Sequence, residues 1–193
     1  KLESKVKLRV NGKYTSNNKE IMLKSISLTE DKNEFLVNEL YLDANLKIKD
    51  LNDFKFSYND TDNQKNELTL HKKKNIYHLK GSSFNANNLI DKYINDEENE
   101  KLNFINQSAE MRIQIDQVLL DDSYKVKNFK GDLKFKDNKI INANIKANFS
   151  ENQKLKFTVQ TKNGEKVTTL FLDQAESIIK RYKFIKGFKS GSL

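Results

Sequence analysis

The chain has 193 residues and carries 35 Lys and Arg residues against 27 Asp and Glu residues, for a net charge of +8. This length excludes a large multidomain enzyme, and the absence of cysteine excludes disulfides, a thiol nucleophile and a cysteine-based zinc site. Hydrophobic residues make up 36% of the chain, below the roughly 45–50% of an average soluble domain, which favours a thin or open core.

Alternation of apolar and polar residues predicts about ten β-strands. The alternation covers residues 6–10, 21–28, 40–48, 54–58, 68–79 with a turn at 72–75, 111–115, 126–135, 141–149, 155–161 and 167–172. A phase slip at Lys24–Ser25 indicates a β-bulge. Asn11–Gly12 and Asn163–Gly164 predict tight hairpin turns, because these residues tolerate a positive φ. The pattern therefore predicts a mainly β fold, a long antiparallel meander sheet.

One face of this sheet is expected to be apolar and the other polar, because the strands alternate in this way. The residues expected to share the apolar face are Val6, Leu8, Phe54, Phe56, Met111, Ile113, Ile115, Phe135, Ile145, Phe149, Phe157 and Val159. A second sheet closing over this face would call for a higher apolar content. The low content favours a sheet curved into an open groove (a β-taco) that suits acyl chains, and a closed sandwich is the alternative.

Two segments change to a helical period, at residues 87–96 and 174–186. In the second, Asp173 and Glu176 form a capping box, and Ile178, Ile179 and Tyr182 form an apolar stripe expected to cover one end of the groove. The two helices align at an offset of 89 residues. The chain, 1–193, is thus expected to be a single β-groove segment with two possible repeats, about 1–100 and 101–193, unless this similarity is a coincidence between amphipathic helices.

Residues that carry out chemistry are sparse. His71 and His78 flank the turn at 72–75 without a third ligand at a suitable spacing, so we expect no metal site. No nucleophile or phosphate-loop motif is present, so neither an enzyme nor a cofactor is expected. The positive charge suits nucleic acid, an anionic membrane surface or a solvated lysine-rich face. Nucleic acid is disfavoured because alternation places Phe54 and Lys55 on opposite faces.

The C-terminal part of the chain resembles a known family. The resemblance rests on the run 126–135, the strands up to Leu172, the segment Asp173–Tyr182 with its acidic start and apolar helix, and the glycine-bearing turn at 185–191. The earlier run 79–86, a strand with Gly81-Ser82-Ser83 that leads into a helix, matches the preceding family element. Over about residues 76–193 the chain resembles the TamB-related, AsmA-like envelope proteins, especially their YhdP-like branch.

This resemblance implies a segment of a longer β-groove protein, anchored in the inner membrane of a Gram-negative bacterium through a part not present here, and lying in the periplasm. Such a protein conducts phospholipid to the outer membrane or regulates that flow, with acyl chains as its partners and no catalytic residues. The absence of an initiator Met and the pattern still developing at Gly191–Leu193 agree with a segment of this kind. The alternative is a structural or interaction β-module of the envelope that conducts no lipid.

Overall fold

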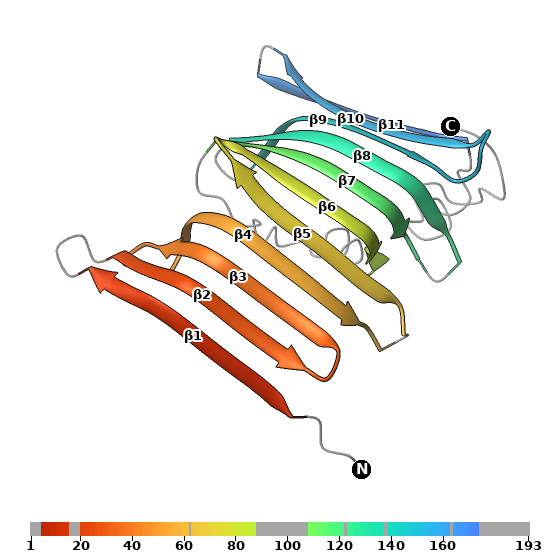
Figure 1. Ribbon diagram of the computed structural model, residues 1–193. Helices are drawn as coiled ribbons and strands as arrows, with labels where there is room; N and C mark the ends of the chain where they lie inside the picture. The colour runs from red at the N-terminus through yellow and green to blue at the C-terminus, as the bar shows by residue number, and fades with distance from the viewer. Residues whose placement is uncertain are drawn as a thin grey trace.

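The computed structural model describes residues 5–15, 20–61, 63–87, 108–121, 123–136, 139–162 and 164–173, which form one 11-stranded sheet (Figure 1). The strands are β1 (Val6–Thr15), β2 (Glu20–Glu30), β3 (Asn33–Leu42), β4 (Ile48–Asn59), β5 (Lys65–Lys73), β6 (Ile76–Asn85), β7 (Ala109–Leu119), β8 (Lys125–Lys136), β9 (Lys139–Asn148), β10 (Lys154–Lys162) and β11 (Glu165–Leu172). The predicted mainly β class is confirmed.

The strands follow one another across the sheet in chain order, from β1 at one edge to β11 at the other (Figure 1). Neighbouring strands are antiparallel except β6 and β7, which run parallel. The expectation of an uninterrupted antiparallel meander is therefore wrong at this pair. Residues 86–108 connect β6 to β7, and a parallel pair needs a long connection because the chain must return to the same end of the sheet.

The sheet is open, because its two edge strands do not pair with each other. A closed sandwich, the alternative considered from composition, is not what the described residues form: they build one sheet, with no second sheet packed on it. The two predicted helices, at 87–96 and 174–186, lie outside the described residues apart from Asn87. This holds equally for the stripe of Ile178, Ile179 and Tyr182.

The predicted turns met different outcomes. Gly164 has φ +82° between β10 and β11, as the hairpin prediction requires. The Asn11–Gly12 turn is wrong, because Gly12 lies within β1 opposite Leu23. A glycine is needed here because β1 and β2 approach each other closely: a Cβ at position 12 would lie 2.7 Å from the carbonyl oxygen of Met22. The register of β1 and β2 shifts here, which confirms the bulge predicted at Lys24–Ser25.

The predicted strand at residues 40–48 is also wrong, because the chain turns between β3 and β4. The turn is fixed by Asp43, whose Oδ1 accepts hydrogen bonds from the backbone N–H groups of Asn45 at 2.8 Å and Lys47 at 2.9 Å. When an aspartate side chain accepts a hydrogen bond from the backbone N–H two residues later in the chain, that N–H is no longer available to a neighbouring strand, and the chain forms a turn.

The core lies on one face of the sheet, called here the apolar face, and the opposite face is called the outer face. The buried residues of the apolar face are mostly supplied by β5–β11 and include Leu68, Ile115, Val118, Val126, Leu133, Ala143, Ala147, Leu155, Val159 and Leu172. Two of them, Ala143 and Ala147, have small side chains that extend only a short way from the sheet. The core on this face is therefore thin, as the low apolar content predicts.

Candidate functional site: the apolar face

One row of side chains crosses the whole sheet on the apolar face. Each member is paired directly with the next, and each strand supplies one. This central row consists of Val10, Ile26, Val37, Phe54, Leu70, Leu79, Ile113, Gly131, Ile145, Phe157 and Leu170. Paired residues of neighbouring strands point to the same side of a sheet, so the row is one continuous surface. Every member is apolar except Gly131, whose place is filled by the Ile145 side chain, 3.0 Å from where a glycine Cβ would stand.

The apolar face changes from exposed to buried along the sheet. On β1 the side chains are open to solvent: Leu8 is 63% exposed and Val10 is 57% exposed. On the far strands they are covered, and Ile115 and Val159 are 4% and 2% exposed. An apolar surface that is covered at one end and open at the other has room for an apolar ligand at the open end.

The residues predicted to share one face are brought together by the register. Phe54, Ile113, Ile145 and Phe157 lie in the central row itself, and the others lie beside it on the same face or pack against its core. The others are Val6, Leu8, Phe56, Met111, Ile115, Phe135, Phe149 and Val159. The basic residues Lys55, Arg112 and Lys156 alternate with them and lie on the outer face.

Four aromatic rings gather where the exposed and buried parts of the apolar face meet. The ring centroids of Phe35 and Phe54 are 5.3 Å apart, those of Phe54 and Phe56 are 5.2 Å apart, and Tyr58 lies 5.4 Å beyond Phe56. These separations are those of favourable edge-to-face and tilted pairs. The rings give this region a stiff apolar surface.

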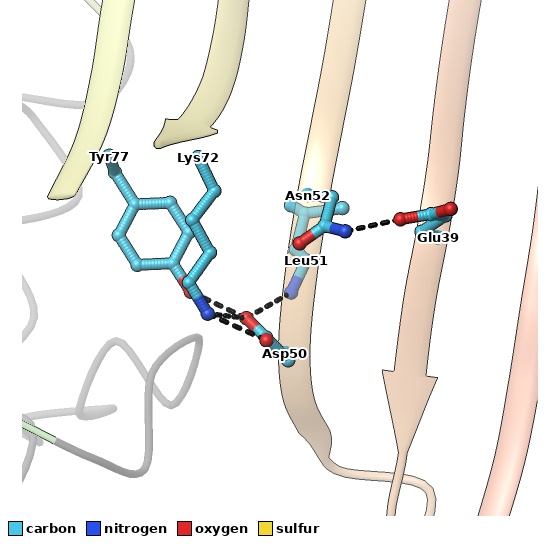
Figure 2. Close-up of polar contacts among 6 residues, drawn as sticks. All are labelled: Glu39, Asp50, Leu51, Asn52, Lys72 and Tyr77. Atoms are coloured by element: carbon cyan, nitrogen blue, oxygen red, sulfur yellow. Dashed lines mark hydrogen bonds and ion pairs between the residues drawn. The ribbon is translucent and has the colours of Figure 1, made fainter. Parts of the chain in front are cut away.

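A polar cluster bounds the apolar face at one end of β4–β6 (Figure 2). Both carboxylate oxygens of Asp50 accept hydrogen bonds from Lys72 Nζ at 2.6 Å, and one accepts a further bond from the Tyr77 hydroxyl at 3.0 Å. The Asn52 amide donates to Glu39 close by. Lys72 and Tyr77 are directly paired, and Lys72 lies two residues beyond Leu70 of the central row, so the cluster borders the row.

The cluster holds its charges in a half-buried setting. Burial raises the pKa of the Asp50 carboxyl, but the hydrogen bonds from Lys72, Tyr77 and the backbone of Leu51 outweigh it and lower the pKa overall. Burial, and then the hydrogen bond to Asp50, raise the pKa of the Tyr77 hydroxyl. Tyr77 is therefore a neutral donor and Asp50 a charged acceptor at neutral pH. No sequence pattern pointed to this cluster, because Asp50 and Lys72 are 22 residues apart.

A second polar cluster bounds the opposite end of the same strands. Asn66, with no exposed surface, accepts a hydrogen bond from the Asn85 backbone at 2.7 Å and donates to the Gln64 carbonyl at 3.0 Å. Asp60 accepts a bond from the Asn85 amide at 2.8 Å. Since Asn66 and Lys72 lie six residues apart on β5, the apolar band between the two clusters is about 20 Å wide.

The histidines and acidic residues of the described part of the chain form no metal site. His71 is directly opposite His78 and forms a 2.5 Å contact with Asp53 on the exposed outer face. In the described part of the chain, no three His, Asp or Glu side chains gather as metal ligands would. Nor is any helix in that part long and apolar enough to cross a membrane.

Comparison of the chain with protein-family models, with curated proteins and with solved structures finds no match. The AsmA-like resemblance noted in the sequence is therefore not supported by any of these comparisons.

Proposed function

We propose that this chain is a segment of a β-groove protein that carries phospholipid acyl chains along its apolar face, for transport to the outer membrane or for regulation of that transport. The proposal includes no catalytic step, no cofactor and no nucleic acid. In line with the family resemblance, it places the segment in the periplasm, anchored in the inner membrane through another part of the protein.

One observation carries the proposal: the central row crosses all eleven strands without a polar side chain. With strands about 4.8 Å apart, the row extends over about 48 Å. Half of a bilayer's hydrocarbon core is about 15 Å thick, so the row is several acyl chains long. A pocket for one small ligand needs no such length, whereas a path along which a chain slides does.

The alternative is a structural or interaction module, in which a partner protein covers the open part of the apolar face on β1. The exposed Leu8 and Val10 favour any apolar occupant, so this alternative has to be separated by experiment.

The first test is extraction of lipid from the purified chain, followed by mass spectrometry. We expect copurifying phospholipid in the wild-type chain and a loss of most of it in Leu8→Asp, because a charge against acyl chains costs several kcal/mol of desolvation. Leu8 is 63% exposed, so the substitution leaves the fold intact.

Arg9→Asp is the matched control, since Arg9 is the next residue on the same strand and pairs with Ser27 on the outer face. It should retain lipid. Absence of lipid from the wild-type chain, or equal retention by both variants, would overturn the conduit and favour the structural module.

A further inference from the structure

The positive charge of the chain is concentrated in three strands. Strands β8, β9 and β10 contain ten lysines and a single acidic residue, Asp132. Of the 35 basic and 27 acidic residues of the chain, this leaves 25 basic and 26 acidic residues elsewhere. The net charge of +8 is therefore a property of one part of the sheet.

At the centre of this region, three lysines lie directly opposite one another on neighbouring strands. Lys146 of β9 pairs with Lys130 of β8 on one side and with Lys156 of β10 on the other. We call them the basic row. Their backbones are only about 4.8 Å apart, and like charges in this arrangement repel one another and destabilise a sheet.

Several other lysines of the outer face are balanced by a carboxylate, although Lys136 also lies opposite Lys139 at the end of the β8–β9 hairpin. Lys55 pairs with Glu34 at 2.7 Å, Lys65 with Glu67 at 2.8 Å, and Lys134 with Glu110 at 2.8 Å. The three lysines of the basic row form no ion pair within the described part of the chain, and the nearby Asp132 faces Arg112 at 3.8 Å. An arrangement that opposes stability while its neighbours are balanced indicates a binding surface for anions.

The surface around the basic row is also shaped for an anionic head group. A shallow hollow of about 530 Å³ opens beside Lys130 and Lys146, and the amides of Asn128, Asn144 and Asn148 line it. The carboxylate of Asp132 also lines the hollow, and Arg112 lies 3.8 Å from this carboxylate. The hollow arises where the β8–β9 register shifts and Asn128 takes a φ of 53°. Ammonium and amide groups together are suitable donors to phosphate oxygens.

An apolar residue adjoins the basic row at the sheet edge. Phe171 of β11 pairs with Lys156 on the outer face and is 44% exposed, and Val167, on the same side of that strand, is 56% exposed. Lysines beside exposed aromatic and aliphatic side chains are typical of surfaces that lie on anionic bilayers. Nucleic acid fits less well, because a stacking platform needs several aromatic rings among the basic residues. In the described part of the chain, Phe171 is the single ring beside the basic row on the outer face, since Phe129 and Phe157 lie on the apolar face.

We propose that the outer face of β8–β10, centred on the basic row and edged by Phe171, binds the surface of an anionic lipid bilayer. This surface lies on the side of the sheet opposite to the central row, so it does not depend on acyl-chain transport.

The test is co-sedimentation of the full 193-residue chain with vesicles of phosphatidylcholine alone or mixed with phosphatidylglycerol. We expect binding to the mixed vesicles that weakens with added salt. The triple variant Lys130→Gln, Lys146→Gln, Lys156→Gln should bind about 100-fold more weakly, because each lysine near an anionic surface contributes about fivefold to the affinity. Its melting temperature should equal or exceed that of the wild type, because the repulsion is removed.

The control is the triple variant Lys7→Gln, Arg9→Gln, Lys13→Gln, which removes three charges from the outer face of β1. If the position of the charges determines the affinity, this variant should bind vesicles within about threefold of the wild type. Phe171→Ser should weaken binding without changing its salt dependence.

Three results would overturn the proposal. The two triple variants could lose affinity equally, which would indicate net charge alone. Binding could be the same on phosphatidylcholine vesicles and be lost in Leu8→Asp, which would assign it to the apolar face. A single-stranded oligonucleotide could displace the chain from the mixed vesicles with a steeper salt dependence, which would make nucleic acid the partner.

Discussion

Individual residues of the apolar face show how closely the strands approach. At Gly81 of β6, a Cβ would lie 2.3 Å from the Glu67 carbonyl oxygen and 2.4 Å from Leu68 Cδ2. Gly81→Ala must therefore move backbone, and we expect a loss of about 1–3 kcal/mol of unfolding free energy, or several degrees in melting temperature. Gly131→Ala is the comparison, because its Cβ would meet only the movable Ile145 side chain at 3.0 Å. Thermal unfolding followed by circular dichroism should rank Gly81→Ala as the more damaging, and the reverse order would contradict the packing.

The charge of Asp50 makes stability depend on acid. Its folded pKa is below the ordinary value of 3.8. In the window below 3.8 the unfolded chain therefore binds the proton first, and the stability that Asp50 provides is present above 3.8 and lost as the pH falls through the folded pKa. Asp50→Asn should lower the free energy of unfolding by about 1–2 kcal/mol at neutral pH. This lies between the contributions of exposed and of buried ion pairs, because the Asp50–Lys72 pair is partly buried. Denaturant unfolding should show this difference shrinking below pH 3.8, and a difference that is constant with pH would exclude the ion pair as its source.

At the scale of single strands, β11 tests the assignment of the two faces. Leu172 has no exposed surface and belongs to the core, whereas the adjacent Phe171 points to the outer face. Leu172→Ala should cost about 2–5 kcal/mol through the cavity it leaves, and Phe171→Ala about 0.5 kcal/mol or less. Chemical denaturation of both variants measures this contrast between neighbours, and similar losses would mean that the strand phase is reversed.

Strands were predictable from sequence where alternation runs unbroken, as in β10 and in residues 111–115 of β7, because there the type of each side chain indicates the face on which it lies. Prediction failed where an extra residue changes the phase. Glu39 and Asn128 have φ values of 52° and 53°, and the register shifts beside Ser82 between β5 and β6. Only the bulge at Lys24–Ser25 left a visible slip. The parallel β6–β7 pair was missed because a pattern of period two is the same for both strand directions.

At the scale of the whole molecule, the members of the candidate site lie far apart in sequence and share only a face. Alternation alone placed twelve residues on that face, because a period of two assigns sides without any tertiary information. The polar clusters at the ends of the strands were not predictable, since Asp50 with Lys72 and Asp60 with Asn85 meet only through strand pairing. The basic row was hidden for the same reason: Lys130, Lys146 and Lys156 become neighbours only when three strands are aligned in register.

The length of the central row leads to the last prediction. If acyl chains travel along it, a photo-reactive side chain should cross-link to lipid at Val10, Phe54, Ile113 and Phe157 alike, because these positions span more strands than one chain of about 15 Å can reach. The same probe at Arg9, Lys55 and Arg112 on the outer face is the control for the first three positions. Lys156 is not used as a control, because it belongs to the basic row. In the full-length protein, Ile113→Asp or Phe157→Asp should abolish cross-linking beyond the substituted strand, because a charge in the row must be desolvated against hydrocarbon at a cost of several kcal/mol. Both side chains are half-buried, so the melting temperature of each variant is measured alongside. Cross-linking confined to Val10, or unaffected beyond a charged strand in a folded variant, would mean that the apolar face holds an occupant without passing it on.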